Sequence, residues 1–389
     1  MLRYHTGPVD VVVIGAGAFG LWTALRLRQA GTSVLLVDAW GPGHSRSSSG
    51  GESRIIRMGY GPDEIYTRMA LHSLAQWREL CETNGEPLFH RTGVLWIGRA
   101  GDPYSEATRD TLQRVGVPAD NLSAADLAQR YTQMVVKDSR AFGILEPHSG
   151  ALMARRAIAT LRRHLIRRGG EYATAAISPP SGRGTLTSVQ TAEGDRIEAG
   201  IFIFACGPWL PKLFPELLAK RIYPTRQEVF FFAPPAGDRR FSPPDLPIWI
   251  DFTDPRGPYG FPDLEARGFK LAFDRHGAPF DPDSGDRNIA PASVAEAQAF
   301  LRERFPLLGD APLAEFRVCQ YENTSNGDFL IDRHPDFENV WLVGGGSGHG
   351  FKHGPAVAEY VSARILGGAP GEARFSLASK GVIQNRSVY

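Results

Sequence analysis

The chain has 389 residues, of which 42% are hydrophobic and 22% charged, a composition typical of a globular enzyme with two packed domains. Its formal net charge of +1 argues against a nucleic acid or an anionic membrane surface as a partner. Its three cysteines show no CxxC or Cys/His spacing. We therefore expect no disulfide scaffold and no metal site. A cytoplasmic location is expected for the same reason.

A dinucleotide-binding pattern begins the chain. Val9–Ile14 is short, continuous and β-branched, which predicts a buried parallel strand. A glycine turn follows, residues 21–30 have helical periodicity, and a second strand over 33–37 ends at Asp38. The apolar run 11–25 contains glycines and is shorter than the roughly 20 residues of a spanning helix, so we expect no membrane segment.

The turn between this strand and helix matches GxGxxG. It consists of Gly15, Ala16, Gly17, Ala18, Phe19 and Gly20. Gly15 makes the turn, Gly17 admits the pyrophosphate, and Gly20 lets the helix pack against the strand. Asp38 lies 18 residues after Gly20, where an acidic residue accepts the ribose hydroxyls. The pattern does not separate NAD from FAD, and a glycine turn in another kind of α/β protein is the less favoured alternative.

The middle of the chain alternates helical and extended segments. In chain order, the predictions are a Gly/Ser-rich loop (41–54), a helix (62–83), strands (88–97), helical pieces (103–136), a basic amphipathic helix (154–168), a strand ending in glycine (201–207), antiparallel strands (222–271) and a helix (294–305). From residue 317 the pattern reads strand, turn, strand, glycine loop and helix.

These elements predict an α/β (α+β) fold with two domains. One is a Rossmann-like nucleotide-binding domain, and the other is a substrate domain with a mostly antiparallel sheet. The nucleotide-binding domain is predicted to comprise residues 1–88, 148–218 and 317–389, and the substrate domain residues 89–147 and 219–316.

The run 344–352 reads Gly-Gly-Gly-Ser-Gly-His-Gly-Phe-Lys, between a strand-like and a helix-like segment. Its glycines allow the backbone to press against a flat ligand, and Lys352 places a cation at the edge of that ligand. The helix that follows would direct its N-terminal dipole at the ligand, which suits a reduced flavin. On spacing alone, a structural glycine turn is as good an interpretation as a cofactor loop.

Other candidate residues also have ordinary interpretations. Cys319, taken alone, is a buried and inert thiol. Lys270 lies in an apolar strand and would by default extend its amine to solvent. Arg54 and Arg57 would by default be surface charges, because their spacing does not require them to share a face of a strand.

Five segments, taken together, resemble one flavoprotein family. They are Ser53-Arg54-Ile55-Ile56-Arg57, Tyr259-Gly260-Phe261-Pro262, Phe269-Lys270-Leu271, Cys319-Gln320-Tyr321 and Ser347-Gly348-His349-Gly350-Phe351-Lys352. In this order they resemble the monomeric sarcosine oxidase and N-methyltryptophan oxidase family, within the D-amino-acid-oxidase-like flavoproteins. The resemblance extends from Val9 to about Gly368 and implies an FAD cofactor and a monomer.

The resemblance implies roles around the cofactor. Cys319 would bind the 8α-methyl carbon of FAD as a thioether, and Arg54 would lie close to the flavin ring. Lys270 would contact flavin N5 through water and promote electron transfer to O₂. The expected FAD-binding residues are Gly15, Ala16, Gly17, Ala18, Phe19, Gly20, Asp38, Ser49, Arg54, Gly207, Cys319, Gly348, Gly350, Phe351 and Lys352.

The resemblance also implies a substrate pocket. Arg57 and Lys352 would hold the substrate carboxylate, Tyr259 would assist, and Tyr321 would line the pocket. Fixed cations on the carboxylate place the Cα–H over flavin N5 for hydride transfer. The expected catalytic residues are Arg54, Arg57, Tyr259, Lys270, Asp274, Tyr321 and Lys352.

The chain departs from the family pattern at the pocket. Asp274 stands where members that act on small substrates have a histidine, and Glu322 follows the pocket tyrosine in place of a neutral residue. Ser49-Gly50 replaces a histidine pair that is common before the first arginine. Two carboxylates near the substrate side chain would oppose an acidic group and favour a basic or polar amine. We therefore do not expect sarcosine itself as the substrate.

The expected activity is FAD-dependent oxidation of a secondary amino acid, with an N-methyl, cyclic or other N-substituent. It would give an imine and, with O₂, H₂O₂. One alternative is a flavoprotein amine dehydrogenase or biosynthetic tailoring enzyme that uses another electron acceptor. Another is a non-catalytic subunit that only holds FAD, against which the presence of both Lys270 and Lys352 argues.

Overall fold

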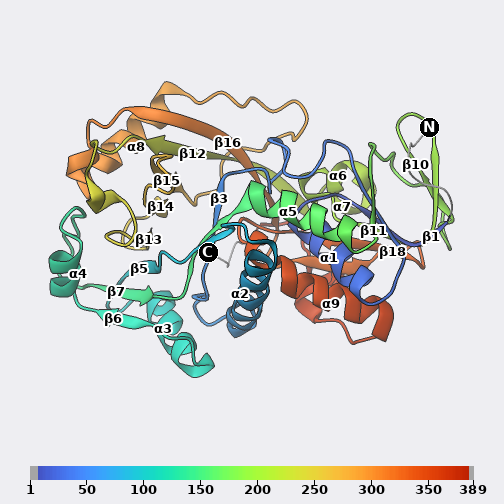
Figure 1. The fold of residues 1–389 in the computed structure, drawn as a ribbon, viewed down its shortest axis with the longest axis horizontal. Coiled ribbons are helices and arrows are strands. Elements are labelled where there is room, and N and C mark those ends of the chain that lie inside the picture. The colour runs from blue at the N-terminus through green and yellow to red at the C-terminus, as the bar shows by residue number, and fades with distance from the viewer. Residues whose placement is uncertain (1–7, 385–389) are drawn as a thin grey trace.

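The computed structural model describes residues 8–384 and contains a mostly parallel sheet at the nucleotide-binding end (Figure 1). Its strand order is β17-β18-β11-β1-β2-β9, and β10 pairs with β11. The strands are β1 (Val9–Ile14), β2 (Val34–Asp38), β9 (Glu171–Thr174), β10 (Ser188–Gln190), β11 (Arg196–Phe204), β17 (Leu330–Arg333) and β18 (Val340–Gly344). β1 lies between β2 and β11, parallel to both, so its β-branched side chains are buried on both faces.

Helices cover this sheet and connect it to the rest of the molecule. They are α1 (Ala18–Gln29), α2 (Glu64–Asn84), α5 (Ala154–Arg167) and α9 (Gly354–Gly367). α1 packs against both α5 and α9, as Figure 1 shows. α1 begins three residues before the predicted start at residue 21, because Gly20 has no side chain to separate the first helical turn from the backbone of Gly15.

The second large sheet is mostly antiparallel and lies at the other end of the molecule (Figure 1). In spatial order its strands are β16 (Leu313–Thr324), β12 (Ile222–Phe232), β15 (Phe269–Phe273), β14 (Pro258–Phe261), β13 (Ile248–Asp251), β5 (Val94–Arg99), β7 (Ala141–Glu146) and β6 (Asp120–Leu122). Only the β13–β5 pair is parallel among the pairs of this sheet within residues 8–384. α8 (Pro291–Arg304) packs an aromatic cluster against it, in which Trp249, Phe269 and Phe305 are fully buried.

Smaller elements complete the fold. α3 (Pro103–Val115) and α4 (Ala124–Arg130) flank the β5–β7–β6 edge, and a small sheet has the order β3 (Ser53–Ile56), β8 (Gly150–Met153), β4 (Phe89–His90). The fold class expected from the sequence, a Rossmann-like unit combined with a mostly antiparallel sheet, is confirmed.

The predicted domain boundary at residue 317 falls inside β16. This strand pairs with β12 from Leu313 to Thr324, so the segment that carries Cys319 joins the second sheet and not the nucleotide-binding sheet. Continuous backbone pairing with β12 holds the strand there, a tertiary contact that local sequence patterns do not report. The division of the chain into domains stays a prediction.

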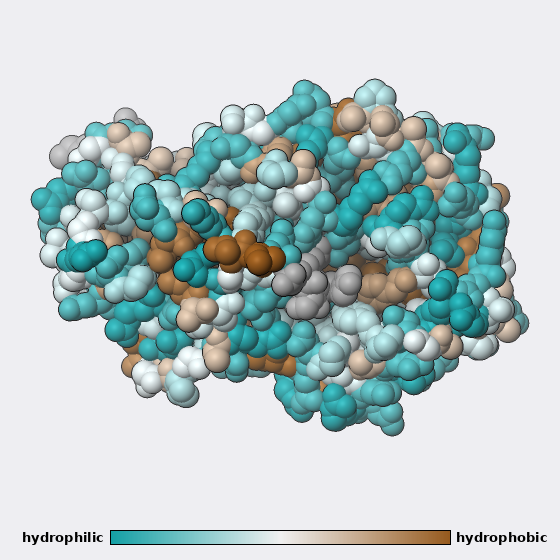
Figure 2. Space-filling view, turned by 180° about the vertical axis from the view of Figure 1, so that it is seen from behind, coloured by the Kyte–Doolittle hydropathy of each residue, from teal (hydrophilic) through white to brown (hydrophobic). Residues whose placement is uncertain are grey.

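The surface on the side of the molecule drawn in Figure 2 is mostly hydrophilic, with small hydrophobic patches. Some of the large hydrophobic side chains that are exposed lie in separate elements, namely Leu71 in α2, Phe316 in β16 and Leu366 in α9, whereas Val382 and Ile383 are neighbours in the chain. Within residues 8–384, no helix combines the length and hydrophobicity needed to cross a membrane.

Candidate active site

A cavity of about 500 Å³ lies where the two large sheets meet. It brings together segments that are far apart in the sequence: the start of α1, the loop before β3, the strands β12, β14, β15 and β16, and the glycine loop. The predicted site residues that line it are Gly17, Ala18, Phe19, Ser49, Arg54, Arg57, Gly207, Tyr259, Lys270, Asp274, Cys319, Tyr321, Gly348, Gly350, Phe351 and Lys352. Gly15, Ala16, Gly20 and Asp38 do not line it, but build the adjoining turn.

The N-terminal glycine turn has the form of a cradle for a ligand. Gly15 has a φ of +106°, and a Cβ there would collide with the backbone of Ala205. A Cβ on Gly17 would stand 3.4 Å from Ser49 Oγ, at the wall of the cavity. Because the backbone of the turn and the N-terminus of α1 face this open space, the turn fits the phosphates of a dinucleotide such as FAD.

Asp38 organises this turn through three backbone hydrogen bonds. Its Oδ2 accepts from Ala16 N at 2.7 Å, and its Oδ1 accepts from Trp40 N at 2.9 Å and Gly41 N at 2.7 Å. The carboxylate thus ties the end of β2 to the glycine turn. A carboxylate keeps acceptor capacity beyond these bonds, so Asp38 still has room to accept from a ribose hydroxyl. That contact stays a prediction.

The C-terminal glycine loop packs tightly against aromatic side chains. Gly348 has a φ of +80°, and a Cβ there would lie 2.7 Å from the ring of Tyr321. A Cβ on Gly350 would lie 2.9 Å from the ring of Phe19. Both interpretations of the loop therefore have support: its glycines allow close internal packing, and Gly346, Gly348 and Gly350 also line the cavity.

Lys270 is buried and does not reach solvent. Its Nζ donates to the carbonyl and the hydroxyl of Ser53, both at 3.1 Å, and lies 4.1 Å from the centre of the Phe261 ring. Burial, and secondarily the charge of Arg54, lower the pKa of Lys270 well below its ordinary value. The default interpretation of Lys270 as a solvent-reaching lysine is therefore wrong.

Arg54 connects the loop before β3 to Cys319. One guanidinium nitrogen donates to Ser53 O at 2.8 Å, and the other donates to Ser48 O at 2.6 Å and lies 3.7 Å from Cys319 Sγ. Arg54 is thus the cation beside the sulfur, whereas Arg317 forms ion pairs with Glu52 and Glu315. A cation in this place stabilises the negative charge of an attacking thiolate.

Arg57 and Lys352 lie together at another wall of the cavity. The guanidinium of Arg57 is held between the rings of Tyr60 and Trp96, 4.5 Å from the centre of each. Lys352 Nζ donates to Tyr60 Oη at 2.6 Å and to His349 O at 3.2 Å. Arg57 and Lys352 are both more than nine-tenths buried, so the interpretation of Arg57 as a surface charge is wrong.

The residues that support Arg57 and Lys352 were not predicted from the sequence. Glu146 is fully buried and accepts hydrogen bonds from Met58 N at 2.8 Å, Gly59 N at 2.9 Å and Trp96 Nε1 at 2.7 Å. It fixes the backbone after Arg57 and one of the two rings that enclose the guanidinium. The sequence does place an aromatic residue, Tyr60, three positions after Arg57, a spacing that could have indicated a contact with the guanidinium. No local pattern connects Arg57 to Trp96 or Glu146, which lie far away in the sequence.

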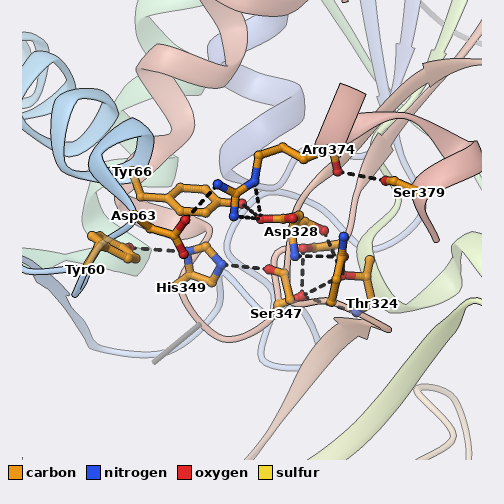
Figure 3. Close-up of polar contacts among 12 residues, drawn as sticks. Tyr60, Asp63, Tyr66, Thr324, Asp328, Ser347, His349, Arg374 and Ser379 are labelled. Atoms are coloured by element: carbon orange, nitrogen blue, oxygen red, sulfur yellow. Dashed lines mark hydrogen bonds and ion pairs between the residues drawn. The ribbon is translucent and has the colours of Figure 1, made fainter. Parts of the chain in front are cut away.

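A buried polar network supports the glycine loop from behind (Figure 3). Tyr66 Oη donates to Asp328 Oδ1 at 2.7 Å, and Arg374 forms ion pairs with both Asp328 and Asp63, at 2.7 and 2.8 Å. Nearby, Ser347 Oγ accepts from Thr324 N at 3.2 Å. The C-terminal segment thus braces the loops that carry the site.

Asp274 and Glu322 both line the cavity but at different places, whereas the expectation put the two carboxylates together beside the substrate side chain. Tyr321 Oη donates to Asp274 Oδ1 at 3.1 Å, and burial together with Asp274 raises the pKa of Tyr259 to about 12. Glu322 lies beside Gly207 and the glycine loop instead. The reason is the alternation of a strand, because neighbouring residues of β16 point to opposite faces.

Glu322 is a buried carboxyl group whose ionisation opposes folding. Burial raises its pKa from 4.5 to about 7, an effect that the backbone N–H groups of Gly345 and Gly346 partly oppose. Its Oε1 has no hydrogen-bond partner within residues 8–384. Between these two pKa values the unfolded chain releases the proton while the folded protein keeps it, so stability falls as the pH rises.

Replacing Glu322 with Gln should remove this pH dependence. From pH 5 to pH 8 the variant should gain on the order of 3 kcal/mol of stability relative to the wild type. Thermal unfolding at a series of pH values measures the change, and a constant difference between the two proteins at all pH values would contradict it.

Comparison with known proteins agrees with this geometry. The FAD dependent oxidoreductase (DAO) family model matches residues 10–364. The chain is 32% identical over 370 residues to the monomeric sarcosine oxidase of Bacillus sp. (strain B-0618), covering 92% of each chain. It is 31% identical over 369 residues to the N-methyl-L-tryptophan oxidase of Salmonella newport (strain SL254), covering 93% of this chain and 95% of the relative.

Solved structures have the same fold at lower identity. L-proline dehydrogenase from P. horikoshii aligns with a TM-score of 0.82 at 19% identity, covering 96% of this chain and 98% of the other. NikD, described as an unusual amino acid oxidase essential for nikkomycin biosynthesis, aligns with a TM-score of 0.76 at 21% identity, covering 95% and 98%. The chain belongs to the FAD-dependent oxidoreductase family, alongside the monomeric sarcosine oxidases and N-methyl-L-tryptophan oxidases.

Proposed function

We propose that this protein is an oxidase of N-substituted amino acids, with O₂ as the electron acceptor and H₂O₂ as a product. The observation that carries the proposal is the cavity itself, in which two buried basic side chains, Arg57 and Lys352, share the walls with Cys319 and Lys270. An amino acid has one fixed anion, its carboxylate, and the paired cations supply the complementary charge. The names of the relatives, which refer to sarcosine and N-methyl-L-tryptophan, support the same substrate class.

FAD would lie between the N-terminal turn and the glycine loop. Gly17 and Ser49 would receive its pyrophosphate, and Cys319 would bind the flavin covalently. When bound, FAD supplies the acceptor for a hydride, which carries two electrons and one proton. The protein supplies placement: a substrate held by its carboxylate presents its Cα–H in one orientation, which converts an encounter into a unimolecular step.

A second group of lining residues would set the preferred side chain of the substrate. Asp274 and Tyr321 provide a carboxylate and a phenol there, with Tyr259 beside them. A substrate with an acidic side chain would place two carboxylates together, which a partly buried site disfavours. We therefore favour N-substituted amino acids with basic or polar side chains over sarcosine.

Lys270 supports O₂ as the acceptor. It is a fixed amine in the cavity, held by Ser53, where a cation would stabilise the negative charge that develops as O₂ is reduced. The word monomeric in the name of the sarcosine oxidase relatives supports a protein that acts as a single chain.

A panel of substrates tests the proposed class. The purified protein is mixed without O₂ with N-methyl, cyclic, glycated and basic amino acids, each paired with its primary amine and with its decarboxylated analogue. We expect bleaching of the flavin absorbance by N-substituted amino acids, faster with a basic side chain than with an acidic one, and little by the decarboxylated analogues. Equal rates with and without the carboxylate would contradict the role of Arg57 and Lys352.

A further inference from the structure

The amine of Lys352 is fixed by two acceptors on the protein side. A carbonyl oxygen can only accept, so the contact with His349 O at 3.2 Å uses one N–H of Lys352. The contact with Tyr60 Oη at 2.6 Å takes a second N–H if the phenol proton points elsewhere. Lys352 lines the cavity, which leaves the remaining direction of Nζ for a ligand there. An ammonium presents an N–H in that direction, whereas a neutral amine presents its lone pair.

The phenol proton of Tyr60 has another destination. His349 Nε2 lies 3.0 Å from Gly327 O, so this nitrogen carries a proton, and in the neutral ring the opposite nitrogen, Nδ1, is an acceptor. Tyr60 Oη lies 3.2 Å from that Nδ1 and can donate to it. Figure 3 draws this contact as a dashed line. His353 Nε2 lies 2.7 Å from the same oxygen, and His353 Nδ1 has no partner in residues 8–384. A proton on Nε2 of His353 satisfies this pattern, with Tyr60 accepting from both His353 and Lys352.

The surroundings of Lys352 favour the neutral amine before a ligand binds. Burial lowers its pKa well below the ordinary value, and the nearby charge of Arg57 adds to this effect. Asp274 and Glu146 oppose it. Burial also lowers the pKa of His353, which favours the neutral imidazole beside Lys352. Burial raises the pKa of Tyr60, so its side chain stays a phenol.

We propose that Lys352 is the proton acceptor for the amino group of the substrate. An N-substituted amino acid in water is a zwitterion, and its ammonium nitrogen must lose a proton before the neighbouring carbon can lose hydride. The N–H bond of that ammonium breaks, a new N–H bond forms on Nζ of Lys352, and the electron pair stays on the substrate nitrogen. The same Nζ then presents its new N–H to the substrate carboxylate.

This inference rests on the proposed function and explains how one lysine serves two purposes. Because the proton moves from substrate to lysine, binding needs no exchange of protons with solvent. The proton transfer creates both the cation on Lys352 that the substrate carboxylate requires and the neutral substrate amine that oxidation requires. Tyr60 is a positioning residue in this account, since it directs the free valence of Nζ to the cavity.

Counting the protons taken up or released on ligand binding tests the proposal on the flavin-containing protein. One ligand is methylthioacetate, a carboxylate with no amine. The other is α-aminoisobutyrate, an amino acid with no hydrogen on the carbon bonded to its nitrogen, so it cannot lose hydride. Calorimetric titration in buffers of different ionisation enthalpy, between pH 6.5 and 8.5, gives the proton count. We expect uptake of about one proton per site with the thioether acid and about none with the amino acid.

The opposite result is equally specific. If the thioether acid binds without proton uptake throughout this range, Lys352 is already charged and the proposal is wrong. If neither ligand perturbs the flavin spectrum while N-substituted amino acids still bleach it, the carboxylate does not bind at Lys352 and the proposal also fails. If no N-substituted amino acid bleaches the flavin, the proposed function itself is overturned.

Lys352→Arg is the decisive variant, because a guanidinium keeps a cation for the carboxylate but cannot act as a base. It should bind the thioether acid with no proton uptake. Its rate of anaerobic flavin reduction by an N-methyl amino acid should rise about tenfold per pH unit up to the pKa of the free amine. Proton uptake that persists in Lys352→Arg would assign the proton to another group, such as Glu322, and reject the proposal.

Discussion

Replacing Lys270 with Met is expected to slow the reoxidation of reduced flavin by O₂ at least about a hundredfold. The reason is the loss of the fixed amine that Ser53 holds in the cavity, where negative charge would develop on O₂ in the proposed reaction. Anaerobic reduction of the flavin by substrate should change much less, since the proposed carboxylate site is at Arg57 and Lys352. Stopped-flow absorbance measures both half-reactions separately.

Lys212→Met is the matched control for this variant. Lys212 is exposed, forms ion pairs with Asp281 and Asp283, and does not line the cavity. It should leave both half-reactions unchanged. An equal loss of reduction and reoxidation in Lys270→Met would show that this lysine supports the shape of the site and has no specific role with O₂. A dehydrogenase that uses another acceptor would reoxidise slowly in air even with Lys270 intact.

Replacing Cys319 with Ser should release the flavin from the denatured polypeptide. In the wild type, a thioether bond to Cys319 would keep the flavin on the chain through acid precipitation, whereas in the variant the flavin should appear in the supernatant. Absorbance of the two fractions measures this directly. The geometry supports Cys319 because its sulfur lines the cavity beside Arg54, 3.7 Å from the guanidinium.

The other two cysteines are the controls. Cys206 donates a hydrogen bond to Ile14 O at 3.3 Å, and burial raises the pKa of its thiol, so it is a poor nucleophile. Cys81 lies in α2, away from the cavity lining. Cys206→Ser and Cys81→Ser should both retain bound flavin on denaturation. Flavin that stays attached in Cys319→Ser would refute the proposed linkage.

The nucleotide-binding unit was predictable because its signals are local. The strand Val9–Ile14 has the predicted bounds, since a β-branched run followed by a glycine turn leaves few alternatives. The resemblance also named residues that the fold brings to one cavity from distant segments, such as Arg57 and Cys319. The order of the motifs along the chain identified these residues, because no periodicity in the sequence relates their positions.

The residues that sequence reasoning missed act through tertiary contacts. Trp96 and Glu146 hold Arg57 from strands β5 and β7, and no local pattern in the sequence reports such pairing. Glu322 is different, because its location was predictable. It follows Tyr321 in a strand, so the alternation of side chains already placed the two residues on opposite faces.

Oxidation of an N-substituted amino acid with O₂ as the acceptor can be followed through one reduction and one reoxidation of the flavin. The purified protein is mixed without O₂ with an N-methyl amino acid that carries a basic side chain, and its flavin absorbance is followed until it is constant. Air is then admitted and H₂O₂ is counted against flavin. We expect full bleaching, full recovery in air, and about one H₂O₂ for each flavin reoxidised. A flavin that no N-substituted amino acid bleaches, or one that recovers without H₂O₂, would contradict the proposed function.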